Sequence, residues 1–283
     1  MQGETVRDTA IETPSGKGAG DENFPVASVL IARRLRPHVM RFYAFARDAD
    51  DIADNPDLAP EERVRRLDLF EAGLAAEATG PAPAVGLRDS LAETGVTDRH
   101  ARDLLVAFRQ DATKLRYADW GELMDYCAVS AHPVGRHVLD LHGEDRATYG
   151  PNDALCAALQ VLNHLQDLGD DRRQLDRVYL PQDWMAEAGI DVTALDANAA
   201  SAGLRQVIGR CLDGCDRLLD VSEPFSALIR SRRLAAEVAV IQRLARRLAA
   251  RLRREDPLAG RVKHSRGDLV AGLAAGLGRL VRP

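Results

Sequence analysis

Apolar side chains recur every three to four residues along most of the chain, beginning at Phe24. This spacing puts them on one face of an α-helix, and it is sustained over 153–175, 202–220 and 226–255, roughly three to eight turns each. No segment alternates with period two for long, as a half-buried strand would. Turn-forming clusters separate the helical runs at Asn55-Pro56-Asp57, Gly80-Pro81-Ala82-Pro83, Gly95 and Gly150-Pro151-Asn152-Asp153. The pattern therefore predicts helices joined by short loops.

Composition agrees with an all-α fold, because aromatic residues make up only 5% of the chain while the good helix formers Ala, Leu and Arg recur throughout. Residues 1–20 lack apolar periodicity and are predicted to be a disordered tail. One all-α domain is expected over 21–283. The net charge of -5 excludes an overall positive field that would gather nucleic acid.

Two further features bear on cofactors and location. No glycine-rich turn between a strand and a helix is visible, so the dinucleotide fingerprint and the phosphate-binding loop are both missing. The sequence shows no secretory leader and no Cys-x-x-Cys pair, which predicts reduced thiols and a cytoplasmic location. The apolar stretch 269–281 is shorter than the roughly 20 residues of a membrane span. It is either a terminal core helix or a surface segment that contacts lipid at the inner face of the membrane.

The first cluster of carboxylates follows the apolar run 39–46. Asp50 and Asp54 are four residues apart and share one helix face, while Asp51 lies about 100° further round the helix. Like charges at this spacing repel one another unless a cation neutralises them. The cluster is therefore either a metal site or a solvated acidic helix end.

The second cluster changes this balance. Asn163, Asp167 and Asp171 recur at intervals of four on a helix that begins near Asp153 and is otherwise largely apolar. Buried carboxylates need partners, which makes a ligand-binding role for this polar stripe the better explanation.

Two carboxylate-bearing helices that face each other across a bundle form an oxygen-rich cage suited to Mg²⁺, which also takes phosphate oxygens as ligands. The predicted metal ligands are Asp50, Asp54, Asn163, Asp167 and Asp171. A di-iron centre is the structural rival, but its Glu-x-x-His pairs are absent. With Arg47 and Arg177 as further clamps, the cage suits a diphosphate leaving group, and an apolar cavity inside the bundle would shelter the carbocation left behind.

Several segments, taken in order, resemble the squalene and phytoene synthase family over residues 22–275. The stretch from Phe42 to Asp54 is similar to its first aspartate-rich motif, and the stretch from Asn163 to Asp171 to its second. Arg177-Val178-Tyr179-Leu180-Pro181 resembles the segment after that second motif, and the stretch from Tyr126 to Gly135 its central helix.

The resemblance implies a single-domain isoprenoid synthase bundle with a central active-site cavity, Mg²⁺ held by both aspartate clusters, and prenyl diphosphate substrates. On this basis Asp50, Asp51, Asp54, Asp167 and Asp171 are expected to take part in catalysis. Tyr126 would be a polar catalytic group near the reacting carbons. Phe24, Arg47, Gln166, Arg177 and Tyr179 are expected to contact the substrate.

Within the family, the stretches from Asn23 to Ser28, from Ala49 to Asp54 and from Asn163 to Asp167 are most similar to the hopanoid-pathway hydroxysqualene synthase subgroup. This resemblance implies conversion of presqualene diphosphate and water to hydroxysqualene, without NADPH. Glu22 and Gln166 stand where enzymes that join two diphosphates commonly carry Arg, which favours a substrate with one diphosphate. Two alternatives stay open: head-to-head condensation of two prenyl diphosphates to presqualene diphosphate, squalene or phytoene, and a non-catalytic helical scaffold.

Overall fold

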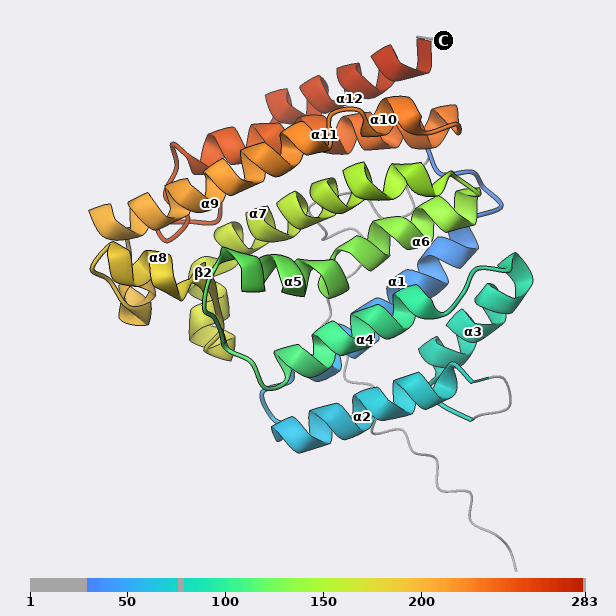
Figure 1. The fold of residues 1–283 in the computed structure, drawn as a ribbon, viewed down its shortest axis with the longest axis horizontal. Coiled ribbons are helices and arrows are strands. Elements are labelled where there is room, and N and C mark those ends of the chain that lie inside the picture. Colours follow the sequence, from blue (N-terminus) through green and yellow to red (C-terminus); the bar gives the residue numbers. More distant parts are fainter. Residues whose placement is uncertain (1–29, 76–78, 282–283) are drawn as a thin grey trace, which may run out of the picture.

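A computed structural model describes residues 30–75 and 79–281, and within these ranges the chain is a helical bundle (Figure 1). The predicted tail 1–20, and Phe24 with it, lie outside the described residues. The α-helices of the first half are α1 (Arg36–Ala53), α2 (Pro60–Gly73), α3 (Ala82–Thr94), α4 (Arg99–Asp111), α5 (Trp120–Ser130) and α6 (His132–His142). Those of the second half are α7 (Tyr149–Leu175), α8 (Gln182–Glu187), α9 (Ala202–Val221), α10 (Phe225–Leu228), α11 (Arg232–Leu252) and α12 (Arg266–Val281). Short 3₁₀ turns, η1 (Arg146–Thr148) and η2 (Val192–Asp196), complete the helical elements.

The bundle has two main hydrophobic cores. The smaller one joins α1 to α4 around Phe45, Phe70 and Leu105, whose side chains are fully buried. The larger one surrounds α7, which packs against α9 and α11 and is the long central helix in Figure 1. The three long helical runs read from the sequence are confirmed as α7, α9 and the pair α10 and α11.

One predicted break is wrong. Gly150 and Pro151 lie inside the first turn of α7, where the missing N–H of proline costs no helical hydrogen bond. The chain turns earlier, at Gly143, which ends α6 in the left-handed region with φ 66°.

Two short parallel strands are present that the period-two test did not reveal. β1 (Arg116–Tyr117) pairs with β2 (Val178–Pro181), with Arg116 opposite Val178. Strands of two and four residues are too short to show alternation. By pairing, the two strands hold the segment after α4 next to the segment after α7.

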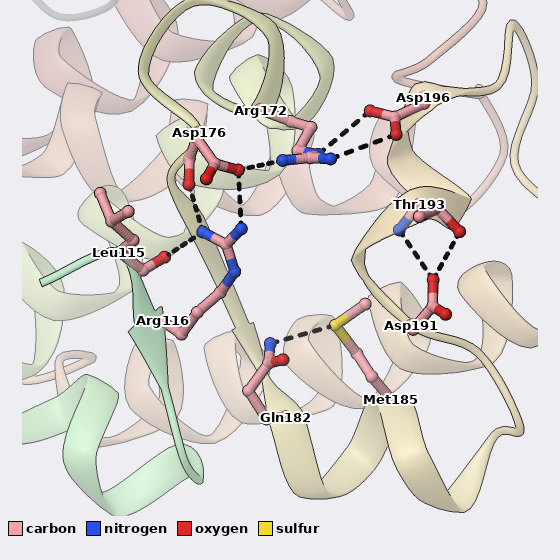
Figure 2. Close-up of polar contacts among 9 residues, drawn as sticks. All are labelled: Leu115, Arg116, Arg172, Asp176, Gln182, Met185, Asp191, Thr193 and Asp196. Atoms are coloured by element: carbon pink, nitrogen blue, oxygen red, sulfur yellow. Dashed lines mark hydrogen bonds and ion pairs between the residues drawn. The ribbon is translucent and has the colours of Figure 1, made fainter.

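The chain reversal between α7 and β2 depends on Asp176, which caps α7 in the left-handed region with φ 50°. Figure 2 shows its carboxylate between the guanidinium groups of Arg116 and Arg172, the first of these contacts being 2.7 Å. Arg172 also binds Asp196 with two hydrogen bonds of 3.0 and 3.2 Å. The hydrogen bonds from Arg116 lower the pKa of Asp176, so the carboxylate stays charged and the turn keeps its shape. Arg177, the next residue, is thereby directed into the protein.

Helix α12 lies along α11 at the edge of the bundle (Figure 1). The two helices approach closely at Gly272 and Gly276, since a Cβ at Gly276 would be only 2.7 Å from a methyl of Val240. The stretch 269–281 is therefore a surface helix rather than a buried terminal one, and its contact with lipid stays a prediction. Among the described residues, no helix is long and apolar enough to cross a membrane.

Candidate active site at the aspartate cleft

Aspartates of α1 and α7 line one cleft of about 460 Å³. Asp51 and Asp54 come from the end of α1, and Asp167 and Asp171 from the last turns of α7. The sequence expectation that the two clusters face each other is met by these four residues. The full lining is Arg47, Asp51, Asp54, Asn55, Pro56, Asp167, Asp170, Asp171, Gln174, Leu175 and Arg261.

Two predicted metal ligands are not in this lining. Asp50 lies one turn before Asp54 on α1, and Asn163 lies one turn before Asp167 on α7. The described geometry brings together Asp54, Asp167 and Asp171 of the predicted set and leaves Asp50 and Asn163 adjacent to the cleft.

The carboxylates are crowded enough to perturb one another. Desolvation and then the charge of Asp167 raise the pKa of Asp171 to about 8, with Asp54 of the opposite helix adding to the effect. The pKa of Asp50 is also raised, by desolvation and then by Asp54. Crowded carboxylates repel one another, and this repulsion favours either protonation or the binding of a cation.

Arginines partly balance this charge. Arg47 contacts Asp50 at 3.3 Å and also pairs with Asp51 on the same helix. Arg261, from the connection between α11 and α12, contacts Asp167 at 3.1 Å. Sequence reasoning missed Arg261, since nothing in a loop 94 residues away in sequence marks it as a neighbour of the second cluster.

Arg177 is the deepest cation of the site, with only 4% of its surface exposed. One terminal nitrogen donates to the Asp54 carboxylate at 2.9 Å and to the Tyr179 hydroxyl at 3.2 Å, and the other donates to the Asp111 carbonyl at 2.9 Å. It therefore links the end of α1 to the end of α4. These contacts place Arg177 and Tyr179 next to Asp54, and their contact with substrate stays a prediction.

Tyr126 lies beside this arginine in a buried polar cluster. Its hydroxyl donates to the carboxylate of Asp111 at 2.8 Å, and its ring lies 5.7 Å from that of Tyr179. His164 stacks on Tyr179 with ring centroids 3.4 Å apart, and burial followed by the charge of Arg177 lowers the pKa of His164 to about 3. The histidine is thus a neutral ring at neutral pH.

Asp111 is a member of this cluster that sequence reasoning missed. It is 3% exposed, and burial raises its pKa to about 7, although Arg177 opposes the shift. A signal was available, because Asp111 continues the apolar face of α4 that carries Leu104 and Phe108. An acid on a buried helix face requires a polar partner, and here the partners are Tyr126 and Arg177.

The position of Gln166 corrects an expectation. Its side chain was expected to face the cavity, one residue round from Asp167, but it is 3% exposed and its amide donates to the carbonyl of Val262. Val262 is itself buried and belongs to the connection before α12. This segment covers that side of α7, and Gln166 bonds to it, while a contact between Gln166 and substrate stays a prediction.

The donor set suits Mg²⁺, because it consists of carboxylate oxygens on two facing helices, with five aspartates against two arginines in the cleft lining. Within residues 30–75 and 79–281, no three His, Cys, Asp or Glu side chains already converge on one point that could hold a metal ion. The arginines that now pair with the carboxylates supply the positive charge in this arrangement.

Comparison with known proteins shows the family of this chain. The family model described as squalene/phytoene synthase matches residues 18–268. Hydroxysqualene synthase of Zymomonas mobilis is 48% identical over 270 residues, covering 94% of this chain and 91% of that protein. Hydroxysqualene synthase of Rhodopseudomonas palustris is 48% identical over 258 residues, covering 90% of this chain and 87% of that protein.

Among solved structures, squalene synthase HpnC from Alicyclobacillus acidocaldarius is similar, with a TM-score of 0.72 and 32% identity. The match covers 81% of this chain and 87% of the other. The residues matched by the family model include both α1 and α7. This chain is therefore a member of the squalene/phytoene synthase family, a family of enzymes that act on prenyl diphosphates.

Proposed function

We propose that this enzyme converts presqualene diphosphate and water to hydroxysqualene and diphosphate, in a reaction that requires Mg²⁺ and no NADPH. The observation that carries the proposal is the cleft bordered by Asp54, Asp167 and Asp171. The identity of 48% to two proteins named hydroxysqualene synthase supports this choice of reaction within the family.

The aspartates of the cleft would hold Mg²⁺, which neutralises the negative charge that develops on the diphosphate as the carbon–oxygen bond breaks. Asp54, Asp167 and Asp171 are the ligands proposed first, with Asp50 and Asn163 next to them. Arg47 and Arg261 stand at the cleft wall, where a guanidinium can donate two hydrogen bonds to phosphate oxygens. Arg177 donates a hydrogen bond to the carboxylate of Asp54 and so fixes its orientation at the cleft.

The buried aromatic cluster beside Arg177 would stabilise the carbocation. The rings of Tyr126, Tyr179 and His164 form a wall from which bulk water is excluded, since each of these residues is at least nine-tenths buried. Aromatic faces stabilise positive charge without reacting with it. Formation of the alcohol then consumes one water molecule and releases one proton, and the expelled diphosphate can accept that proton.

Condensation of two prenyl diphosphates is the second candidate. The absence of a cation at Gln166 no longer argues against it, because the amide of Gln166 is bonded to Val262 and does not border the cleft. Contact with a membrane surface is a further part of the proposal, because the product is apolar.

Substrate assays separate the two reactions. Purified protein is given presqualene diphosphate or farnesyl diphosphate in separate reactions with Mg²⁺, and the products are identified by mass spectrometry. We expect hydroxysqualene from the first and no product from the second. Consumption of farnesyl diphosphate would establish condensation instead, and full activity in excess EDTA would refute the metal requirement.

A further inference from the structure

Helix α12 is amphipathic in an unusual sense, since it buries its small residues and exposes its large apolar ones. Gly272 and Gly276 face α11, and a Cβ at either position would press on side chains of that helix. Leu273 and Leu277, by contrast, are each 62% exposed. The exposed apolar face of α12 is formed by Leu269, Val270, Leu273, Leu277 and Val281.

This face is not explained by folding. Within the described residues, five of the eleven large hydrophobic side chains that are exposed lie on this single helix of 16 residues. Each leucine left in water gives up the stabilisation that burial of its side chain would supply. Contiguous apolar patches of this kind mark sites where a protein meets another apolar surface.

The charges beside the face are predominantly positive. Arg232, which donates to the carbonyl of Leu280, and Arg247, which contacts Asp268 at 3.3 Å, extend from α11 to α12. Arg266 is exposed at the start of α12, one turn before Leu269.

The acids beside the face already have partners. Asp268 is buried and paired with Arg247 and Arg251, and Glu223 contacts Arg246 at 3.0 Å. In a chain with a net charge of -5, this edge therefore carries locally positive charge next to an apolar helix face.

From this juxtaposition we infer that α12 docks on an anionic phospholipid bilayer, with its leucines in the interface and the neighbouring arginines at the headgroups. An apolar face flanked by arginines matches both components of such a surface, the acyl chains and the negative phosphates. A second copy of the chain would have to place these arginines against one another, which is unfavourable. The inference is independent of the proposed reaction, because it concerns binding to lipid.

The docked helix would be connected directly to the aspartate cleft. The connection before α12 places Arg261 on Asp167 and is held to α7 by the bond from Gln166 to Val262. A membrane that fixes α12 therefore also fixes one wall of the cleft, through residues 253–265.

Vesicle flotation tests the inference with the full chain. Vesicles of phosphatidylcholine with phosphatidylglycerol are compared with vesicles of phosphatidylcholine alone, at low and high salt. We expect the wild type to float with the anionic vesicles at low salt and to bind the neutral ones less. The double variant Leu273→Glu, Leu277→Glu should lose about tenfold or more of this binding, since two acidic side chains cannot enter the interface. Arg266→Gln should weaken it by about fivefold and reduce its salt dependence.

The matched control is Val106→Glu with Val134→Glu, which places the same charges at valines that are 52% and 44% exposed on α4 and α6. This variant should bind as the wild type does. Circular dichroism confirms that each variant is folded. Equal binding by the wild type and the leucine variant would overturn the inference, as would equal binding to both kinds of vesicle. A dimer in solution that the leucine variant converts to a monomer would identify the face as a contact between two copies instead.

Discussion

At the scale of single residues, the aspartates of the site can be recognised in the sequence, whereas several of their partners cannot. Asp54, Asp167 and Asp171 are recognisable from their spacing, because a helix repeats its faces every three to four residues. Arg261 and Asp111 could not be paired with them from sequence, since each reaches the site through a contact between distant elements. The bond from Gln166 to Val262 could not be foreseen for the same reason, because helical geometry gives the direction of a side chain but not the segment that covers it.

Removal of one cleft carboxylate should abolish most activity without unfolding the protein. Asp54→Asn and Asp171→Asn preserve side-chain size, and each should lower kcat by about 10²-fold or more through lost transition-state stabilisation. The matched control is Asp57→Asn, a change at an exposed aspartate three residues after Asp54. Steady-state rates with thermal melting measure the effect. A wild-type rate in either cleft variant would contradict the assigned role.

The buried Asp111 should make stability depend on pH. The pKa of Asp111 in the folded protein, about 7, is higher than in an unfolded chain, where it is about 4. The folded protein therefore binds a proton at this carboxylate more tightly. The resulting stabilisation is complete below the unfolded pKa and is lost as the pH rises through about 7. Compared with Asp111→Asn, which keeps an acceptor for Tyr126, the wild type should lose about 2 to 4 kcal/mol of stability between pH 4 and pH 8. Urea unfolding at each pH gives this difference, and a flat or rising difference would contradict the argument.

At the scale of elements, the sequence predicts long amphipathic helices well and short elements poorly. The runs that became α7 and α9 have enough turns to show a periodicity, whereas β1 and β2 do not. The orientation of α12 was also undetermined, because leucines and glycines alternate along it and either set can be buried. Close packing at Gly272 and Gly276 decides this in favour of exposed leucines.

The packing of α12 can be tested at two glycines of the same helix. Gly276→Ala should destabilise the protein by about 1 to 3 kcal/mol, since the new methyl would lie 2.7 Å from Val240 and 3.2 Å from the Ala236 carbonyl oxygen. Gly278→Ala is the control, because no atom lies within 4 Å of its Cβ position, and it should stabilise by about 0.5 to 1 kcal/mol through helix propensity. Chemical denaturation measures both. Equal effects at the two positions would show that α12 does not pack on α11 in this way.

At the scale of the whole molecule, an all-α fold with two facing aspartate helices follows from the sequence pattern, and the structure realises it around α1 and α7. The part that the sequence could not supply is the enclosure of the site. The walls come from β1 and β2, from the end of α4 and from the connection before α12, which are brought together only by folding. An apolar cavity large enough for the prenyl chains stays a prediction of the proposed function.

The most direct test of the proposed reaction follows the oxygen atom of the product. The enzyme is incubated with presqualene diphosphate and Mg²⁺ in water enriched in oxygen-18, without NADPH, and the product is analysed by mass spectrometry. We expect hydroxysqualene whose hydroxyl carries the label, formed together with free diphosphate. An unlabelled alcohol, or squalene that forms only after NADPH is added, would contradict it.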